Sequence, residues 1–467
     1  MIRFYNAQIL KRNQDGRYYT ESGEIVTDGA RILHVGAPIS FSDRSSRLPA
    51  PDSQPSRDID CHGNLLIPGF KNCHTHSAMT LLRGAGEGLP LKRWLYERIF
   101  PLESRMMPED VYFAAHLAIA EYLAGGTTAA QDMYFYADET ARAVTEAGFR
   151  CVGVGASADS DGKTEESLRR QEELLKKYTA GGAFSFRVGF HAEYTASDAL
   201  LKGVKILSER FQSPVHFHLS ETEAEVRECL ARTGKTPPER IASFGLFGRG
   251  GAAYHCVHLR DGDLKYFSHE GACIGECGRQ ASDRFGRVGE STNDYENGGM
   301  YIVSNPRSNL KLGSGSAPLK KYLEKGLRVA LGTDGAASNN RLSMFDELNT
   351  AVLLSKVNDG GIGIGADAAL DAAFYDGAFA MGTPDARALE VGMRADIVLL
   401  DIDRPNMRPQ TNSVDRLVYS ASDSNVLLTM VGGRILYENG EYATGVDYER
   451  VKREFEARVR RLSETEN

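Results

Sequence analysis

The stretch Pro68–Gly84, PGFKNCHTHSAMTLLRG, places two histidines one residue apart in a chain that contains only 11. Side chains alternate between the two faces of a β-strand, so His74 and His76 would share one face while Cys73 and Thr75 share the other. Two imidazoles close together on one face indicate either a metal site or a coincidence. The rest of the chain has to decide between these interpretations.

From about residue 62 onward, short apolar runs alternate with amphipathic segments of helix length, which is the pattern of βαβ units in a parallel sheet. The segment Pro108–Ala124, for example, starts with a proline and is followed by a glycine pair, as a helix would be. The predicted strands are Asn64–Ile67 running toward His76, Thr127–Met133, Arg150–Gly155, Phe186–Ala192, Pro214–Leu219, Ala252–His258, Met300–Ser304 and Arg328–Gly332. This α/β pattern predicts a (β/α)₈ TIM barrel over residues 62–392.

The two ends of the chain, residues 1–61 and 393–467, show short β-type runs separated by turns. Near the C-terminus, Val426–Val431 and Arg434–Tyr437 flank a glycine pair, as the two strands of a hairpin do. The segment Asp447–Leu462 has apolar residues at helical spacing, so it is expected to pack one face on the body. We expect the two ends to form one small composite β-sandwich domain beside the barrel.

A polar, glycine-rich stretch at about 275–301 fits neither a strand nor a helix of the barrel pattern. We interpret it as an insertion that forms a surface loop or an oligomer contact, so a homo-oligomer stays open. A metal-binding pair of Cys273 and Cys277 is the alternative interpretation.

Composition narrows the class of protein. The chain has 467 residues, 42% of them apolar and 25% charged, as is usual for a globular protein. A net charge of −8 without a dense Lys/Arg run argues against a nucleic-acid partner. Seven scattered cysteines do not form a disulfide framework, and no signal peptide or membrane-spanning run is evident. We therefore expect a cytoplasmic protein without a membrane partner.

In a parallel barrel, functional residues gather at the C-terminal ends of the strands. The predicted strand ends carry His74, His76, His191, His218, Glu221, His255 and Asp334. Three imidazoles and one carboxylate suit one divalent ion per chain, Zn²⁺ first and Fe²⁺ as the alternative. The residues that can supply this set are His74, His76, His218 and Asp334. Glu221 would stand beside the ion as an acid/base, and His216 is expected one layer deeper in the barrel.

Six motifs, in order along the chain, carry a family resemblance. They are PGFKNCHTHSAMTLLRG, HFHLSETEAE from His216, HCVHL from His255, SNPRSNLKLGSG from Ser304, GTDGAASNN from Gly332 and ADIVLLD from Ala395. Together they resemble the amidohydrolase superfamily, and more narrowly its methylthioadenosine/S-adenosylhomocysteine deaminase branch, which has chlorotriazine hydrolases as near relatives. The resemblance covers nearly the whole chain apart from the insertion. It implies the barrel with a composite β-sandwich, and a mononuclear site, since the fourth strand offers no Lys for a bridging carbamate.

The resemblance implies a hydrolytic deaminase that converts a small molecule, an aminopurine nucleoside of the adenosine, 5′-methylthioadenosine or S-adenosylhomocysteine type, to the inosine-type product and ammonia. Asp334 would receive the proton of the attacking water, Glu221 would protonate the ring nitrogen, and His255 would hydrogen-bond the attacking hydroxide and the oxyanion that follows. The substrate-binding positions that the resemblance implies are Trp94 against the ligand, Glu103 at the ribose hydroxyls, and His191 at the base or ribose.

Three departures from the branch bear on the substrate. Ser304 stands where the branch usually has His, and Glu193 stands where it usually has Pro. The Arg that holds an amino-acid carboxylate near the end of strand three is missing from Gly153–Ser157, although Arg169 or Arg170 could reach a second such site. These departures favour a smaller 5′ group. The alternatives are a deaminase of a free base such as guanine, an s-triazine hydrolase, and an inactive scaffold of the same fold.

Overall fold

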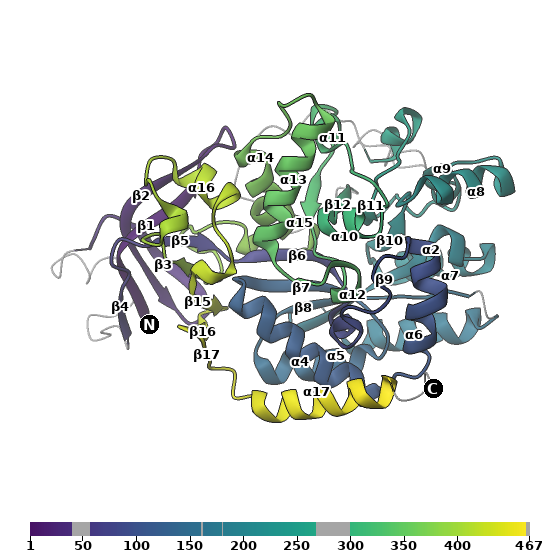
Figure 1. Cartoon of the computed structure of the whole chain (residues 1–467), viewed down its shortest axis with the longest axis horizontal. Helices are drawn as coiled ribbons and strands as arrows, with labels where there is room; N and C mark the ends of the chain where they lie inside the picture. Colours follow the sequence, from purple (N-terminus) through teal and green to yellow (C-terminus); the bar gives the residue numbers. More distant parts are fainter. Residues whose placement is uncertain (40–56, 160–161, 180, 268–298, 464–467) are drawn as a thin grey trace.

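Two sheets build the molecule, one from the middle of the chain and one from both of its ends (Figure 1). The computed structural model describes residues 1–467 except 40–56, 160–161, 180, 268–298 and 464–467. The expected insertion, with its two cysteines, therefore lies outside the described residues apart from 299–301, which lead into a barrel strand.

The central sheet is the predicted parallel barrel, and its strands follow one another in sequence order from β6 to β13. They are β6 (Phe70–Thr75), β7 (Thr127–Met133), β8 (Cys151–Val154), β9 (Phe184–Ala192), β10 (Val215–Leu219), β11 (Gly251–His255), β12 (Met300–Ser304) and β13 (Val329–Leu331). The first and last strands meet where the Asp334 amide donates to the His74 carbonyl at 3.0 Å. The (β/α)₈ prediction is confirmed.

Helices join the barrel strands and surround the sheet (Figure 1). They are α2 (Leu91–Trp94), α3 (Phe100–Glu103), α4 (Pro108–Ala124), α5 (Ala137–Ala147), α6 (Thr164–Lys177), α7 (Asp198–Phe211), α8 (Glu223–Thr233), α9 (Pro237–Ser243), α10 (Pro306–Lys311), α11 (Leu319–Glu324), α12 (Ala336–Asn339), α13 (Met344–Asn358), α14 (Ala366–Leu370) and α15 (Asp376–Ala380). The predicted helix Pro108–Ala124 is confirmed, and a short 3₁₀ helix, Ser77–Leu82, follows β6 directly.

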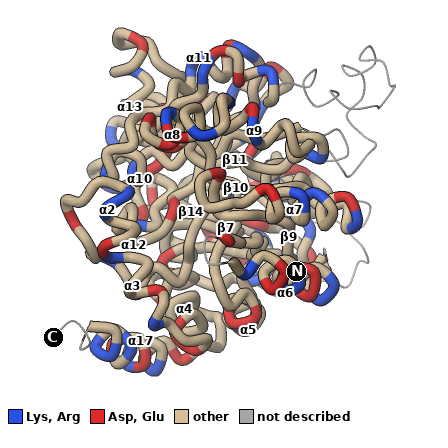
Figure 2. The backbone as a smooth tube through the Cα atoms, turned by 90° about the vertical axis from the view of Figure 1, so that its right-hand side faces the viewer, with Lys and Arg blue, Asp and Glu red and all other residues tan. Residues whose placement is uncertain are grey.

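The last helix, α17 (Tyr448–Ser463), lies along the outside of α4 (Figure 1). Its apolar face buries Val451, Phe455 and Leu462, while basic and acidic residues alternate along the rest of the helix (Figure 2). The predicted C-terminal helix is confirmed. Its apolar residues at helical spacing form one face, and the helix buries that face against the body.

The second sheet combines both ends of the chain in the order β17-β16-β15-β14-β5-β1-β2-β3, and β4 pairs with β1. Its strands are β1 (Ile2–Arg12), β2 (Tyr18–Asp28), β3 (Arg31–Gly36), β4 (Arg57–Asp60), β5 (Leu65–Pro68), β14 (Ile397–Leu400), β15 (Val426–Val431), β16 (Arg434–Glu438) and β17 (Glu441–Tyr442), and helix α16 (Ser413–Tyr419) lies between β14 and β15. The sheet curls over a core of its own, because the Ile32 amide of β3 donates to the Met393 carbonyl just before β14 (2.9 Å). The composite sandwich from both termini is confirmed.

The hairpin near the C-terminus follows the prediction. Val431 pairs with Arg434, and Gly432 and Gly433 between them have φ angles of 54° and 79°. Two successive positive φ angles suit the tight turn that joins antiparallel strands, and glycine adopts them at little cost.

The predicted strand from Asn64 toward His76 is wrong in its first half. Leu65–Pro68 is β5 of the terminal sheet, where it pairs with β1 and β14, and the barrel strand starts only at Phe70. Gly69 makes the crossing between the two sheets, and a Cβ there would lie 2.1 Å from the Thr128 side chain. Both strands are buried on both faces, so an apolar run does not reveal to which sheet it belongs.

Within the described ranges, no helix is both long enough and apolar enough to span a bilayer. The cysteines of the described residues, Cys61, Cys73, Cys151, Cys229 and Cys256, are all free and buried.

A buried ion cluster joins the barrel floor to the terminal sheet. Asp396, just before β14, accepts a hydrogen bond from Arg150 Nη1 at 2.6 Å and lies 3.9 Å from Lys71 Nζ. Lys71 also donates to the Gly69 carbonyl at 2.6 Å, and burial lowers its pKa to about 8. One carboxylate therefore lies beside two cationic side chains at the junction of the two domains.

Replacement of Asp396 by Asn should destabilise the protein by about 3 kcal/mol, because it leaves buried cations without their counter-charge. Chemical denaturation would measure the loss. The matched acid-to-amide control is Glu97→Gln, which removes an exposed pair with Arg93 and should leave the midpoint unchanged. Equal midpoints for the two variants would contradict the role of Asp396.

Candidate metal centre and active site

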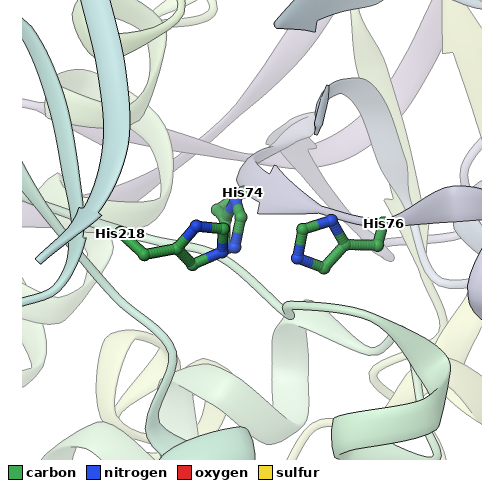
Figure 3. Close-up of side chains that lie close together, drawn as sticks. All are labelled: His74, His76 and His218. Atoms are coloured by element: carbon green, nitrogen blue, oxygen red, sulfur yellow. The ribbon is translucent and has the colours of Figure 1, made fainter. Parts of the chain in front are cut away.

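Three predicted histidines, from two separate parts of the sequence, meet at the C-terminal mouth of the barrel (Figure 3). His74 lies near the end of β6, His76 follows that strand, and His218 lies near the end of β10. The ring centroid of His74 is 4.8 Å from those of both His76 and His218, and the three rings offer ligand nitrogens within 4.8 Å of one another. The period-two alternation inferred for the NCHTH segment therefore holds in the fold.

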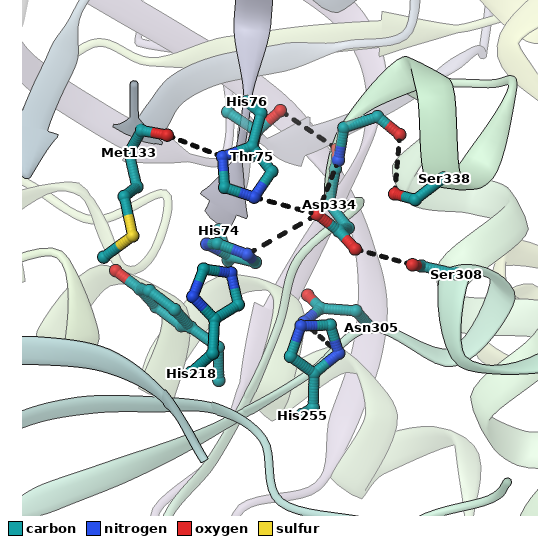
Figure 4. Close-up of polar contacts among 12 residues, drawn as sticks. His74, Thr75, His76, Met133, His218, His255, Asn305, Ser308, Asp334 and Ser338 are labelled. Carbon is teal, nitrogen blue, oxygen red and sulfur yellow. Dashed lines mark hydrogen bonds and ion pairs between the residues drawn. The ribbon is translucent and has the colours of Figure 1, made fainter. Parts of the chain in front are cut away.

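Asp334, which follows β13, completes this cluster (Figure 4). Its Oδ1 lies 3.2 Å from His76 Nε2 and 3.6 Å from His74 Nε2, and its Oδ2 accepts a hydrogen bond from Ser308 Oγ at 2.5 Å. Burial pushes the pKa of Asp334 upward, but the His76 hydrogen bond and the other imidazoles hold it well below its usual range. The backbone of Asp334 has a φ of 59°, a strained value for a non-glycine residue, such as clusters at functional sites.

Backbone carbonyls orient two of the imidazoles. His76 Nδ1 donates to the Met133 carbonyl at 2.5 Å, and His218 Nδ1 donates to the His191 carbonyl at 2.6 Å. Each ring therefore turns its Nε2 toward the cluster, which is how the second hydrogen bond of a ligating histidine usually orients the ring.

His74 tests whether this cluster fits a metal. The residue is fully buried and stacks on Tyr254 at 3.7 Å, yet neither of its ring nitrogens has a hydrogen-bond partner among the described residues. Burial, with the neighbouring His76, lowers the pKa of His74 well below its usual value, so the ring is neutral. A buried polar atom without a partner is costly, and a divalent ion held by imidazoles and one carboxylate satisfies it.

Glu221 and His255 stand beside the cluster. Glu221 Oε1 accepts a hydrogen bond from Ser314 Oγ at 2.9 Å, and its Oε2 lies 3.8 Å from His255 Nε2. Burial raises the pKa of Glu221, which favours retention of a proton. His255 Nδ1 lies 2.8 Å from Asn309 Oδ1, to which it can donate, and this leaves its Nε2 toward Glu221. Among the described residues, His255 also belongs to a second group of candidate metal ligands, with His74 and Asp334, whereas Glu221 belongs to neither group.

Several supporting residues were not predicted. Glu225 accepts the amides of Ser220 and Glu221, both at 2.8 Å, and so holds the loop that carries Glu221. Ser308 donates its hydroxyl to the Asp334 carboxylate, and Asn309 Oδ1 can accept from His255 Nδ1, so these two residues hold the side chains of Asp334 and His255. The available signal was their position within the quoted motifs HFHLSETEAE and SNPRSNLKLGSG, which are rich in short polar side chains.

His216 lies in β10 one layer below the cluster, as expected. It is fully buried, and its Nδ1 accepts a hydrogen bond from Gln131 Nε2 at 2.9 Å. It belongs to neither of the two groups of candidate metal ligands found among the described residues.

A cavity of about 800 Å³ opens above the cluster, and the three substrate positions implied by resemblance all line it. Trp94 is buried, and its indole N–H donates to the Ala85 carbonyl at 2.9 Å. Glu103 is half-buried, and its Oε1 accepts a hydrogen bond from the Tyr134 hydroxyl at 2.7 Å. His191 has its Nδ1 3.0 Å from Thr195 Oγ1, and burial lowers its pKa to about 4, so the ring is neutral.

The departures in the sequence have visible consequences. Arg170 donates hydrogen bonds to Asp138 and, at 3.4 Å, to Glu173. Arg169 lines the cavity without a hydrogen-bond partner among the described residues. The segment Gly155–Ser157 contributes only small residues to the cavity wall.

Glu193 does not line the cavity. It is buried and accepts hydrogen bonds from Arg232, at 2.6 Å, and from Arg240. The acid that replaces the usual proline is therefore part of a structural ion cluster behind the cavity wall.

Comparison with known proteins agrees with this geometry. The amidohydrolase family pattern matches residues 65–436. The chain is 38% identical to a 5-methylthioadenosine/S-adenosylhomocysteine deaminase of Syntrophomonas wolfei subsp. wolfei, over 90% of this chain and 95% of that protein. It is 39% identical to a 5′-deoxyadenosine deaminase of Methanothermobacter thermautotrophicus, over 90% of each. The chain therefore belongs to the amidohydrolase family.

Among solved structures, an adenosine deaminase from Xanthomonas campestris with bound zinc superposes with a TM-score of 0.84 and 28% identity, over 98% of this chain and 99% of that one. The chain is a hydrolytic deaminase of its family, and its buried imidazoles and carboxylate fit a divalent metal ion.

Replacement of His74 by Ala should abolish metal binding, because it removes one of the converging nitrogens. The metal content of the purified protein, measured by elemental analysis, should fall from about one ion per chain to a small fraction of that value. His216→Gln, on the layer below, is the matched control and should keep its metal. Full metal content in the His74 variant, with its fold intact by circular dichroism, would contradict the assignment.

Proposed function

We propose that the protein hydrolyses the exocyclic amine of an adenine nucleoside, with one zinc ion held by His74, His76, His218 and Asp334. The observation that carries the proposal is the convergence of these four side chains with Glu221 and His255 at one end of a cavity large enough for a nucleoside. The relatives named as deaminases of adenosine derivatives support the choice of substrate. Zinc is preferred over iron because imidazole and carboxylate ligands suit it and a relative contains it.

The bound ion would lower the pKa of a water molecule toward neutrality and so supply a nucleophile at pH 7. Asp334 takes the proton that this water gives up. Its Oδ2 is held by Ser308 and its Oδ1 faces the imidazoles, so the carboxylate keeps one orientation while it gains and loses the proton.

Glu221 acts as the acid. Burial raises its pKa, so that it can carry a proton to N1 of the purine ring as the water adds to C6. The C6–N bond then breaks, and a proton delivered through Glu221 or Asp334 accompanies the leaving amine as ammonia. Ser314 holds one oxygen of Glu221, and Glu225 holds its backbone, so the proton is offered from a fixed position.

His255 stabilises charge on the attacking oxygen. Its Nδ1 donates to Asn309 Oδ1, so Nε2, which faces the mouth of the barrel beside Glu221, donates to the attacking oxygen when the ring carries a proton on both nitrogens. A donor held in place before the reaction stabilises the developing oxyanion without reorganisation.

The substrate's sugar lies toward Glu103, and its base packs near Trp94 and His191. An ionised carboxylate that lines a cavity is a good acceptor for the two hydroxyls of a ribose. The segment Gly155–Ser157 after β8 carries no arginine, which favours a small uncharged 5′ group, as in adenosine or 5′-deoxyadenosine. Arg169, which lines the same cavity, is a cation that could meet an amino-acid carboxylate.

Wild-type protein with Zn²⁺ should release ammonia from adenosine and its 5′-deoxy and 5′-methylthio derivatives. Glu221→Gln should lower kcat by about 10²- to 10⁴-fold, the usual contribution of an acid/base, while the metal content stays the same. Glu223→Gln, an exposed neighbour on α8, is the control and should turn over normally. Turnover restricted to guanine or a triazine, or near-normal activity of the Glu221 variant, would contradict the proposal.

The KM for adenosine should rise by about tenfold as the pH falls from about 8 to about 6. Burial raises the pKa of Glu103 to about 7, although the Tyr134 hydrogen bond opposes this shift. Protonation below that pKa removes the acceptor for the ribose hydroxyls, so binding weakens at low pH. Steady-state kinetics would measure the effect. Glu103→Gln should flatten this dependence, and an unchanged slope in that variant would show that another group titrates.

A further inference from the structure

Met133, the last residue of β7, and Tyr134, which follows it, each contact a side chain at a different end of the cavity. The Met133 carbonyl accepts the hydrogen bond of His76 Nδ1 at 2.5 Å, which sets the orientation of a candidate metal ligand (Figure 4). The next residue, Tyr134, donates its hydroxyl to Glu103 Oε1 at 2.7 Å. The metal end and the sugar end of the cavity are therefore connected through one strand end.

Tyr134 is held firmly. Its side chain is only 6% exposed, and its ring centroid lies 6.2 Å from that of His76. It packs in an apolar cluster that also contains Met79, Trp94 and Met106. A tyrosine has only two side-chain torsions, so packing of the ring fixes the position of the hydroxyl.

The carboxylate of Glu103, in contrast, is held by few contacts. Glu103 is the last residue of a continuous helical run made of α2, a π-helical turn (Leu95–Ile99) and α3, and the α3 turn buries none of its residues fully. Among the described residues, Tyr134 is the only hydrogen-bond donor to its carboxylate, and Oε2 has no partner. The Tyr134 hydroxyl therefore occupies one oxygen and leaves the other available at the cavity surface, which Glu103 lines.

We propose that Tyr134 is a positioning residue that fixes the Glu103 carboxylate at a set place relative to His76 and thereby makes the enzyme select nucleosides with an intact ribose diol. This inference rests on the proposed function, in which Glu103 accepts the ribose hydroxyls. With the carboxylate fixed, a diol that binds to Oε2 brings C6 of its purine to the metal end. Without the Tyr134 hydroxyl, no hydrogen bond among the described residues holds the carboxylate in place, so its side chain can rotate and the diol is no longer placed relative to the metal end.

The test compares kcat/KM for adenosine and for 2′,3′-dideoxyadenosine. The two nucleosides share the base, but only adenosine has the 2′- and 3′-hydroxyls. The variants are Tyr134→Phe, Glu103→Gln and the double variant, each with its metal content measured. The control is Tyr112→Phe on α4, which removes a comparable tyrosine–carboxylate hydrogen bond, to Glu146 Oε2 at 2.5 Å, outside the cavity.

The wild type should prefer adenosine, and Tyr134→Phe should reduce that preference by about tenfold, as expected for the loss of a hydrogen bond to a charged group. The double variant should be no worse than Glu103→Gln, because Tyr134 acts through Glu103. Metal content should be unchanged, and Tyr112→Phe should keep the wild-type preference. A purely structural role of Tyr134 would lower both rates together and leave their ratio unchanged.

Other outcomes separate the two claims. If Glu103→Gln loses the preference and Tyr134→Phe keeps it, the positioning role is wrong and the proposed function stands. If the wild type does not discriminate between the two nucleosides, or Glu103→Gln still does, Glu103 is not the diol acceptor, and the inference falls with that part of the proposed function. If neither nucleoside is deaminated, the proposed function itself is wrong.

Discussion

The hydrogen bond from the Asp334 amide to the His74 carbonyl closes the barrel and makes the site. It joins the last strand to the first, and a second contact, from the Thr333 amide to Asn72 Oδ1 at 3.0 Å, reinforces it. Gly332 allows the two strands to come this close, because a Cβ there would lie 2.7 Å from the backbone nitrogen of His74. Without this seam, the carboxylate that follows the eighth strand would not reach the imidazoles of the first.

Closing the barrel buries carboxyl groups, and Glu347 shows how groups from the loops satisfy one of them. Burial raises the pKa of Glu347 to about 8, and this residue accepts hydrogen bonds from the Arg307 amide at 3.1 Å and from Asn339 Nδ2 at 2.6 Å. Asn339 also donates to the Thr333 carbonyl, next to Asp334. Because an unpaired buried carboxylate is costly, these hydrogen bonds tie together the loops after strands seven and eight, next to Asp334.

Much of this could be predicted from the sequence because the signals are local. The alternation in NCHTH follows from strand geometry, and a set of His and acidic residues at strand ends points to one mouth in a parallel barrel. The strand Leu65–Pro68 could not be assigned, because a run buried on both faces looks the same in either sheet. Ser308 and Tyr134 were not predicted, because their roles depend on hydrogen bonds to residues in other loops.

By itself, the sequence determined the alternation of strands and helices, the joining of both ends into one small domain, and the types of side chain gathered at the strand ends. Period and residue chemistry are properties of short segments, so they can be read along the chain. Only the tertiary structure decided which nitrogen of His76 and of His218 faces the cluster, which oxygen of Glu103 is left open, and that the ring nitrogens of His74 have no hydrogen-bond partner among the described residues. These features depend on distances between segments that meet only when the barrel closes.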